Sequence, residues 1–281
     1  MQTIRNEYLE VSARKFGAEL TSIKNLKTGR EYLWQPNKEV WTGQSPILFP
    51  IVGRAKNDRL RIDGNEFPIK MHGFARKNEF SINSVSQNHI EYILTNNDEL
   101  VKSFPYNFEL YVRYEITENI LKMTFKVKNT DNRTIYFSIG AHPGFNCKLG
   151  DRLEFEKNET LCTQVMNDEH YRHTELNYLK NENQITIKAD TFANDALIFQ
   201  NTNSEIITLK AQDNSYSVEF NYKNAPFLGL WAKPGAPYVC IEPWFGADDR
   251  SDEDFDFCDK PTVQNIKQGD IFEYTMEITI R

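Results

Sequence analysis

The sequence predicts an all-β protein, because apolar and polar residues alternate with a period of two from one end of the chain to the other. Few segments have the period of a helix, and only residues 97–103 are expected to form one short helix. Polar turns recur roughly every 8–12 residues, which is typical of a β-sandwich or a barrel. No linker rich in Pro, Gly or Ser and no internal repeat divides the chain. We therefore expect residues 1–281 to form a single domain.

The clearest strands are expected at 108–116 and 121–127, where polar and apolar residues alternate strictly. A turn of Asn, Thr, Asp and Arg follows at 129–133, so residues 135–142 are expected to return as the second arm of a hairpin. That segment has one apolar face and one small, polar face that ends at His142. Because Gly140 leaves space beside the backbone, the polar face is expected to be the floor of an open groove. Further strands are expected at 80–85, 89–94, 185–188, 196–199, 206–209, 217–222, 227–231, 238–241 and 271–280.

Composition excludes several classes of partner. Apolar residues make up 40% and aromatic residues 13% of the chain, which indicates an ordered globular protein. A net charge of −7 argues against nucleic acid or an anionic membrane, since both attract clustered Lys and Arg. Residues 1–7 lack the apolar h-region expected of a signal peptide, and no run of 18 uninterrupted apolar residues occurs. We expect a cytoplasmic protein with a small-molecule partner, and a homodimer is left open.

Nothing in the sequence indicates a resident metal or a nucleotide. The four cysteines show no CxxC pairing and are expected to be reduced, mostly buried thiols; they are Cys147, Cys162, Cys240 and Cys258. Glu169, His170 and His173 lie in a polar segment that is expected to be a loop, and His89 is expected to be an ordinary polar residue. The Asp-rich run 248–254 lacks the register of a calcium loop and is expected to be solvated. P-loop, GxGxxG and GxSxG motifs are absent.

Two titratable residues, His142 and Glu242, each end a predicted strand and are each followed by a proline. A proline fixes the local backbone, so both side chains are expected to be held in place. One carboxylate and one imidazole on opposite sides of a bound ring can open a cyclic hemiacetal, because one takes the anomeric proton and the other protonates the ring oxygen. This chemistry needs neither a redox cofactor nor a metal.

Five short segments, in this order, carry a resemblance to a known family: 49–54 (Phe-Pro-Ile-Val-Gly-Arg), 72–76 (His-Gly-Phe-Ala-Arg), 140–145 (Gly-Ala-His-Pro-Gly-Phe), 194–197 (Asn-Asp-Ala-Leu) and 242–244 (Glu-Pro-Trp). Together they resemble the aldose 1-epimerase (galactose mutarotase) family, most closely its LacX-like branch. The resemblance covers nearly the whole chain. It implies a β-supersandwich with a sugar in a groove on the concave face of the large sheet, and no cofactor.

The resemblance also implies roles for individual residues. Glu242 would be the general base and His142 the general acid, with His72 a second acid or an orienting donor. Arg54 and Asp195 would hold sugar hydroxyls. The founding galactose mutarotases have different residues beside the first histidine, at the positions of 73–76. The identity of the sugar substrate is therefore left open.

Arg76 and Trp231 complete the predicted sugar-binding set, since an arginine can bind hydroxyls or anions and an indole can stack on a sugar ring. Five basic residues lie in or between the first two motifs, which raises the alternative of a phosphate pocket; they are Arg54, Arg59, Arg61, Arg76 and Lys77. We expect Arg59, Arg61 and Lys77 to be ordinary solvated charges and the substrate to be an unphosphorylated aldose.

Three other functions stay open at this point. A carbohydrate-binding or sensing protein would keep the groove without useful turnover, and a hexose 6-phosphate mutarotase would keep the chemistry with a different substrate. A cupin-like metal enzyme would use His72, His142 and Glu242 as a triad of ligands. The usual close pair of ligands on one strand is missing for that triad, so we expect no metal.

Overall fold

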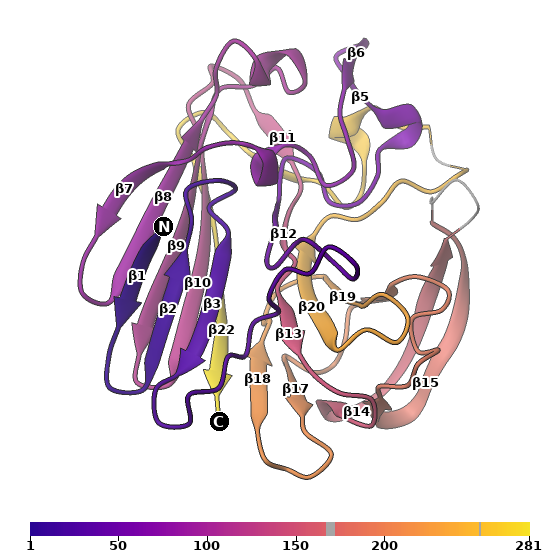
Figure 1. The fold of residues 1–281 in the computed structure, drawn as a ribbon. Helices are drawn as coiled ribbons and strands as arrows, with labels where there is room; N and C mark the ends of the chain where they lie inside the picture. The colour runs from indigo at the N-terminus through magenta and orange to yellow at the C-terminus, as the bar shows by residue number, and fades with distance from the viewer. Residues whose placement is uncertain (167–171, 253) are drawn as a thin grey trace.

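The computed structural model of the chain describes residues 1–166, 172–252 and 254–281, and it consists mainly of β-strands (Figure 1). The all-β prediction is confirmed. The segment predicted as a short helix forms only a 3₁₀ turn, Leu100–Lys102, and three further 3₁₀ turns lie at Lys56–Asp58, Ala75–Lys77 and Phe257–Asp259. Among the described residues, no helix is long and apolar enough to cross a membrane.

A nine-stranded antiparallel sheet is the largest element of the fold. Its central strands show the predicted alternation, because every second side chain of β9 and β10 is buried. In spatial order the strands are β15 (Arg172–Thr186), β14 (Arg152–Met166), β17 (Ile206–Lys210), β18 (Ser217–Asn221), β22 (Ile271–Ile280), β10 (Ile120–Asn129), β9 (Phe108–Thr117), β8 (His89–Thr95) and β7 (Ser81–Val85).

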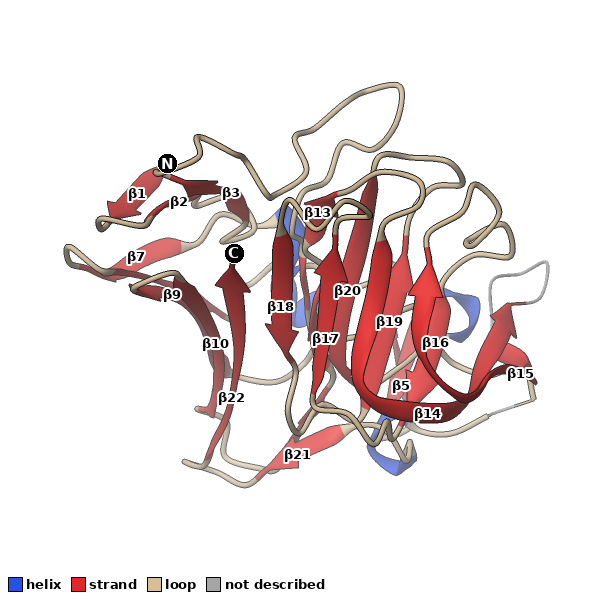
Figure 2. Cartoon of the chain, turned by 90° about the horizontal axis from the view of Figure 1, so that it is seen from below, coloured by secondary structure: helices blue, strands red, loops and turns tan. Residues whose placement is uncertain are grey.

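A three-stranded sheet covers one end of the large sheet (Figure 2). Its strands are β1 (Gln2–Arg5), β2 (Leu9–Ala13) and β3 (Leu20–Asn25). Two buried tyrosines join the layers, since Tyr92 Oη donates to the Ala13 carbonyl at 2.9 Å and Tyr114 Oη donates to the Ala18 carbonyl at 2.7 Å. These bonds satisfy the hydroxyls of side chains that otherwise fill the apolar core.

A six-stranded sheet lies toward the other end, beside β14 and β15 (Figure 2). It carries the segments with the two proline-locked residues. Its strands are β16 (Leu197–Gln200), β19 (Phe227–Trp231), β20 (Tyr238–Phe245), β12 (Ile139–Ala141) and β4 (Ile47–Leu48), with β13 (Gly144–Asn146) paired to β20. Two small pairs complete the fold: β5 (Arg59–Ile62) with β6 (Asn65–Pro68), and β11 (Ile135–Phe137) with β21 (Gln264–Ile266).

The hairpin predicted between 121–127 and 135–142 is wrong. β10 pairs with β9 and β22, whereas β11 pairs with β21 and β12 pairs with β20 and β4. The turn explains the difference, because the Asn129 amide is buried and donates to the carbonyls of Arg133 and Ile266. The chain is thereby directed toward β21 and into the second sheet, so it does not return along β10.

The predicted groove floor is also corrected. The segment 135–142 is interrupted at Ser138, and a Cβ on Gly140 would lie 2.7 Å from the indole of Trp244. Trp244 therefore occupies the space that the glycine leaves, and only His142 of this face reaches the cavity described below. Sequence analysis also missed β14 and most of β15, where charged residues weaken the alternation.

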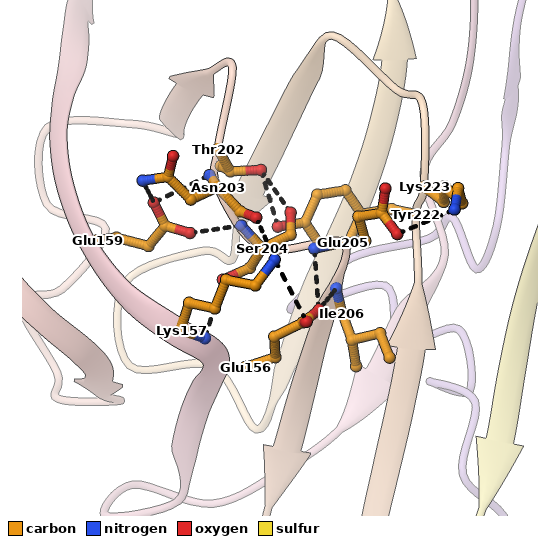
Figure 3. Close-up of polar contacts among 10 residues, drawn as sticks. All are labelled: Glu156, Lys157, Glu159, Thr202, Asn203, Ser204, Glu205, Ile206, Tyr222 and Lys223. Atoms are coloured by element: carbon orange, nitrogen blue, oxygen red, sulfur yellow. Dashed lines mark hydrogen bonds and ion pairs between the residues drawn. The ribbon is translucent and has the colours of Figure 1, made fainter.

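Buried carboxylates in this fold are not all functional. Glu159 on β14 is fully buried, and its carboxylate accepts the backbone N–H groups of Asn203 and Ser204 at 3.1 and 2.7 Å (Figure 3). Glu156 accepts the N–H groups of Glu205 and Ile206 in the same way, both at 3.1 Å (Figure 3). Both carboxylates hold the loop between β16 and β17. Glu156 is exposed, whereas the buried oxygens of Glu159 have partners, which is the usual state of a structural buried acid.

Candidate active site

A cavity of about 310 Å³ lies at the edge of the six-stranded sheet. All seven residues that the sequence marks as catalytic or sugar-binding line it: Arg54, His72, Arg76, His142, Asp195, Trp231 and Glu242. They come from segments far apart in the chain, so the fold has brought them together. Among the other lining residues are Trp41, Met71, Met166, Trp244 and Asp248.

Glu242 lies in β20, a strand whose side chains are all buried. Its neighbour on β19 is Gly229, and a Cβ there would lie 2.7 Å from the ring of Trp244. His142 follows β12 directly, and its own N–H donates to the Pro46 carbonyl at 3.1 Å. The next residue, Pro143, accepts the N–H of Ile241 at 3.2 Å, so the His142 and Glu242 segments are bonded to each other.

The two side chains are neighbours, with His142 Nδ1 and Glu242 Oε1 3.4 Å apart. Sequence reasoning places them on opposite sides of a ring, whereas the structure places them side by side. His142 Nδ1 and Glu242 Oε2 are both buried, and neither has a hydrogen-bond partner among the described residues. A buried polar atom without a partner costs about 1–3 kcal/mol, so a fold that keeps two of them together indicates a site for a ligand.

Burial shifts these two groups in opposite directions. Burial, together with the charge of the Arg76 guanidinium, lowers the pKa of His142 to about 3. Burial raises the pKa of Glu242 well above its ordinary value, and the carboxylates of Asp195 and Asp248 add to the rise. Between these two pKa values the pair carries one proton in all. It therefore offers one proton donor and one proton acceptor at the same time.

His72 is held as a neutral hydrogen-bonding group. Its backbone is in the left-handed region, with φ 64°, and the N–H of Gly53 donates to its Nδ1 at 3.0 Å. Nδ1 is thus the acceptor and Nε2 carries the proton. Burial holds the pKa of His72 well below its ordinary value, and the charges of His142, Arg76 and Arg54 act in the same direction. Of the two roles considered, this geometry favours an orienting donor over a second acid.

Two indoles enclose the His142 ring. Trp41 stacks on it with centroids 5.3 Å apart and an interplanar angle of 29°, and Trp231 meets it edge-on at 5.6 Å. Sequence analysis missed Trp41, which lies in the loop between β3 and β4 and has no periodic signal. The Trp41 carbonyl anchors that loop, because it accepts the N–H groups of Trp34 Nε1 and Asn37, both at 3.0 Å.

Only two of the five basic residues in the first motifs reach the cavity, and both have a buried Nε atom without a hydrogen-bond partner among the described residues. They are Arg54, which is 3.5 Å from Asp58, and Arg76, which donates to the Met71 carbonyl at 3.1 Å. The other charges point elsewhere, as expected: Arg59 pairs with Glu66, Arg61 pairs with Asp254 and Asp256, and Lys77 is exposed.

The solvated loop expected at 248–254 is wrong for its first residue. Asp248 is only 5% exposed, and its Oδ1 accepts the backbone N–H of Arg54 at 2.8 Å. The next residue, Asp249, also binds the Arg54 backbone, because its N–H donates to the Arg54 carbonyl at 3.0 Å. Gly53 has φ 69°, and a Cβ there would collide with the Asp248 carboxylate. Asp252 and Asp254 are exposed, as expected.

Of the remaining polar candidates, Asp195 reaches the cavity and His89 does not. Asp195 lies on its rim, exposed and in a turn with φ 74°. His89 bonds with the hydroxyls of Ser84 and Ser86, as expected for an ordinary polar residue. Glu169 and His170 lie outside the described residues, and so does the side chain of His173. Cys147 and Cys240 are buried free thiols, Cys258 is partly buried and Cys162 is exposed.

The triad of metal ligands considered from the sequence does not converge as proposed. In the described part of the chain, one group of three possible ligands has its donor atoms within 4.8 Å of one another, and it consists of His142, Cys240 and Glu242. His72 is not part of that group. Cys240 and Glu242 are two residues apart on β20 and therefore point to the same face of the strand.

The family model for aldose 1-epimerase matches residues 1–267 of this chain. The chain belongs to the aldose 1-epimerase family. Two curated relatives from Lactococcus lactis subsp. lactis, the plasmid and chromosomal forms of protein LacX, are 32% identical over 99% of this chain and 98% of their own lengths. The resemblance to the LacX-like branch is thus confirmed.

Solved structures support the same relationship. A galactose mutarotase related enzyme from Lactobacillus acidophilus is 33% identical with a TM-score of 0.95, and it covers 100% of this chain and 97% of its own. A galactose mutarotase-like protein from Lactobacillus casei is 26% identical with a TM-score of 0.94 and full coverage of both chains. The predicted galactose mutarotase-like fold is confirmed. The family indicates carbohydrate isomerase chemistry for this aldose 1-epimerase relative.

Proposed function

We propose that the protein is a cofactor-independent mutarotase that interconverts the α and β anomers of an aldose. The observation that carries this proposal is the buried pair of His142 and Glu242, which lines the cavity and has polar atoms without a hydrogen-bond partner in the described part of the chain. A volume of about 310 Å³ is at the lower end of the range for ligand cavities, which suits a monosaccharide.

The reaction needs two proton transfers and one bond cleavage. At neutral pH the proton of the pair lies on Glu242, and we assign its first movement to His142 Nδ1, 3.4 Å from Glu242 Oε1. The Glu242 carboxylate then takes the proton from the anomeric hydroxyl, while the C1–O5 bond breaks and a C1 carbonyl forms. The donor, assigned to His142, protonates the ring oxygen. The free aldehyde turns about C1–C2, and the same two transfers run backward to close the ring on its other face. Atoms and protons balance, and the pair returns to its starting state.

The other cavity residues suit the binding of hydroxyl groups. Neutral His72 offers a hydrogen-bond donor, Arg54 and Arg76 offer guanidinium N–H groups, and Asp195 offers a carboxylate at the rim. Trp231 provides an apolar wall beside His142. Because the carboxyl groups of Asp195, Asp248 and Glu242 share the cavity with the two guanidinium groups, we propose an unphosphorylated aldose as substrate.

Polarimetry of single anomers, freshly dissolved with and without the protein, tests this proposal. The panel should contain hexoses, pentoses and hexose 6-phosphates. Faster approach to equilibrium for at least one free aldose is expected. Turnover confined to the 6-phosphates would overturn the choice of an unphosphorylated sugar. Binding of a sugar without any acceleration would favour the alternative of a sensing protein.

A further inference from the structure

We propose that His142, Cys240 and Glu242 form a binding site for a thiophilic divalent cation of the Zn²⁺ class, and that occupation of this site blocks the acid–base pair. The binding itself depends only on these three side chains. The loss of turnover rests on the proposed mutarotase function.

The positions of the donor atoms favour a tetrahedral cation. In such a site, Zn–N and Zn–O bonds of about 2.0–2.2 Å and a Zn–S bond of about 2.3 Å place the ligand atoms roughly 3.3–3.8 Å apart. His142 Nδ1 and Glu242 Oε1 are already 3.4 Å apart. All three donor atoms lie within 4.8 Å of one another, so closure around a cation requires a movement of roughly 1 Å at most.

The ligand atoms are buried and available. His142 Nδ1 and Glu242 Oε2 have no hydrogen-bond partner among the described residues, and Cys240 is a free thiol with no exposed surface. The strands hold these three side chains close together. Cys240 and Glu242 share one face of β20, and Cys240 lies directly opposite Gly144, which follows His142 by two residues. On binding, the thiol and the His142–Glu242 pair each release one proton to solvent as the S–Zn, N–Zn and O–Zn bonds form, so two protons leave for each cation bound.

The type of cation follows from the ligands. A set with one sulfur, one nitrogen and one oxygen atom selects Zn²⁺ or Cd²⁺ over Mg²⁺ and Ca²⁺, which prefer oxygen alone. Three protein ligands leave the fourth position for water or a sugar hydroxyl. The bound cation would occupy the lone pairs that carry the catalytic protons, so we expect an inhibitor and not a cofactor.

Cobalt spectroscopy tests the site without reference to turnover. The chelator-stripped protein is titrated with Co²⁺, and we expect one ion per chain, visible d–d bands of a tetrahedral site and a near-ultraviolet thiolate-to-cobalt band, all displaced by Zn²⁺. Cys240→Ala should abolish the thiolate band and weaken Zn²⁺ binding by at least about tenfold. The matched control is Cys162→Ala, which removes an exposed cysteine and should leave the spectrum unchanged.

Inhibition is then measured for each variant against its own metal-free rate. Zn²⁺ should inhibit the wild type at stoichiometric concentrations, and Cys240→Ala should raise the inhibitory concentration at least about tenfold. If Cys240→Ala fails to fold, Cys240→Ser replaces it. A wild-type cobalt spectrum without the thiolate band would overturn the inference, and so would Zn²⁺ inhibition that neither Cys240→Ala nor Cys240→Ser relieves. A positive spectrum on a protein that turns over no sugar would uphold this site and contradict only the proposed function.

Discussion

Replacing Asp248 by asparagine should stabilise the protein in a way that depends on pH. Asp248 is buried beside the cavity, and burial raises its pKa from 3.8 to about 6. Asparagine keeps the shape and the acceptor oxygen that bonds to the Arg54 N–H, but it carries no charge. The backbone N–H of Arg54 and the charges of Lys260 and Arg172 oppose this rise in pKa, and all of them remain in the variant.

The sign of this effect on stability follows from the pKa of Asp248 in the unfolded chain, which is the ordinary value, and its raised pKa in the folded protein. Below about pH 4 the carboxyl is protonated in both the folded and the unfolded chain, so its ionisation costs nothing. Between pH 4 and 6 the unfolded chain ionises first, and the free energy of unfolding of the wild type therefore falls as pH rises. Above pH 6 the loss is complete. A shift of about two pKa units, at 1.36 kcal/mol per unit, corresponds to roughly 3 kcal/mol.

The assay is urea unfolding of wild type and Asp248→Asn at several values between pH 4 and 8. All other titrating groups are shared, so the difference between the two proteins isolates this carboxyl. We expect the advantage of the variant to grow by roughly 3 kcal/mol from pH 4 to pH 7.5. Asp213→Asn is the control with a flat profile, because the hydrogen bonds of Ser215 hold the pKa of Asp213 below its ordinary value and its carboxyl is ionised in the folded and unfolded chain over nearly all of this pH range. A difference that stays constant with pH would refute the reasoning.

Four further predictions concern activity. Glu242→Gln and His142→Asn should each lower kcat by about 10²–10⁴-fold in a folded protein. The double variant should lose much less than the product of the two single losses, because the two proton transfers are coupled. Near-normal turnover by Glu242→Gln would reassign the role of base to Asp195. Since the pKa of His142 is low and that of Glu242 is high, the wild-type rate should stay level across neutral pH, and a narrow optimum would contradict the shared proton. Exhaustive treatment with EDTA should leave turnover intact, and loss of activity that one metal restores would exclude a metal-free mechanism. Arg76→Ala should raise KM with little change in kcat. The control, Arg61→Ala, removes a paired charge outside the cavity and should change neither constant. Equal effects of the two substitutions would show that Arg76 does not bind the sugar.

Apart from β14 and most of β15, the strands of the large sheet could be predicted because one face of each packs on the core and the other meets solvent. β9 and β10 show this most clearly, with strictly alternating burial. The same rule fails in the second sheet, where every residue of β20 is buried and alternation disappears. It also misled us after β10, since the course of the chain depends on the distant Asn129–Ile266 hydrogen bond.

Six of the seven predicted site residues lie in segments that resemble family motifs, and the seventh, Trp231, was predicted because an indole can stack on a sugar ring. Trp41 and Asp248 lie outside those segments, and their roles depend on distant partners: Trp41 on His142, and Asp248 on the backbone of Arg54. A charged run such as 248–254 has the composition of a solvated loop whether or not its first residue is buried. Its only local hint was its position six residues after Glu242, at the end of a strand.

Exchange NMR on an equilibrated aldose tests the central claim most directly, because it measures ring opening itself. Saturation of one anomeric proton is transferred to the other anomer at a rate set by the catalyst. With the aldose selected by polarimetry, the account predicts an exchange rate that rises in proportion to wild-type protein and falls to the buffer rate with Glu242→Gln, although that variant still binds the sugar. Equal exchange by the two proteins would contradict a mechanism that depends on Glu242, and no exchange by either would contradict a mutarotase.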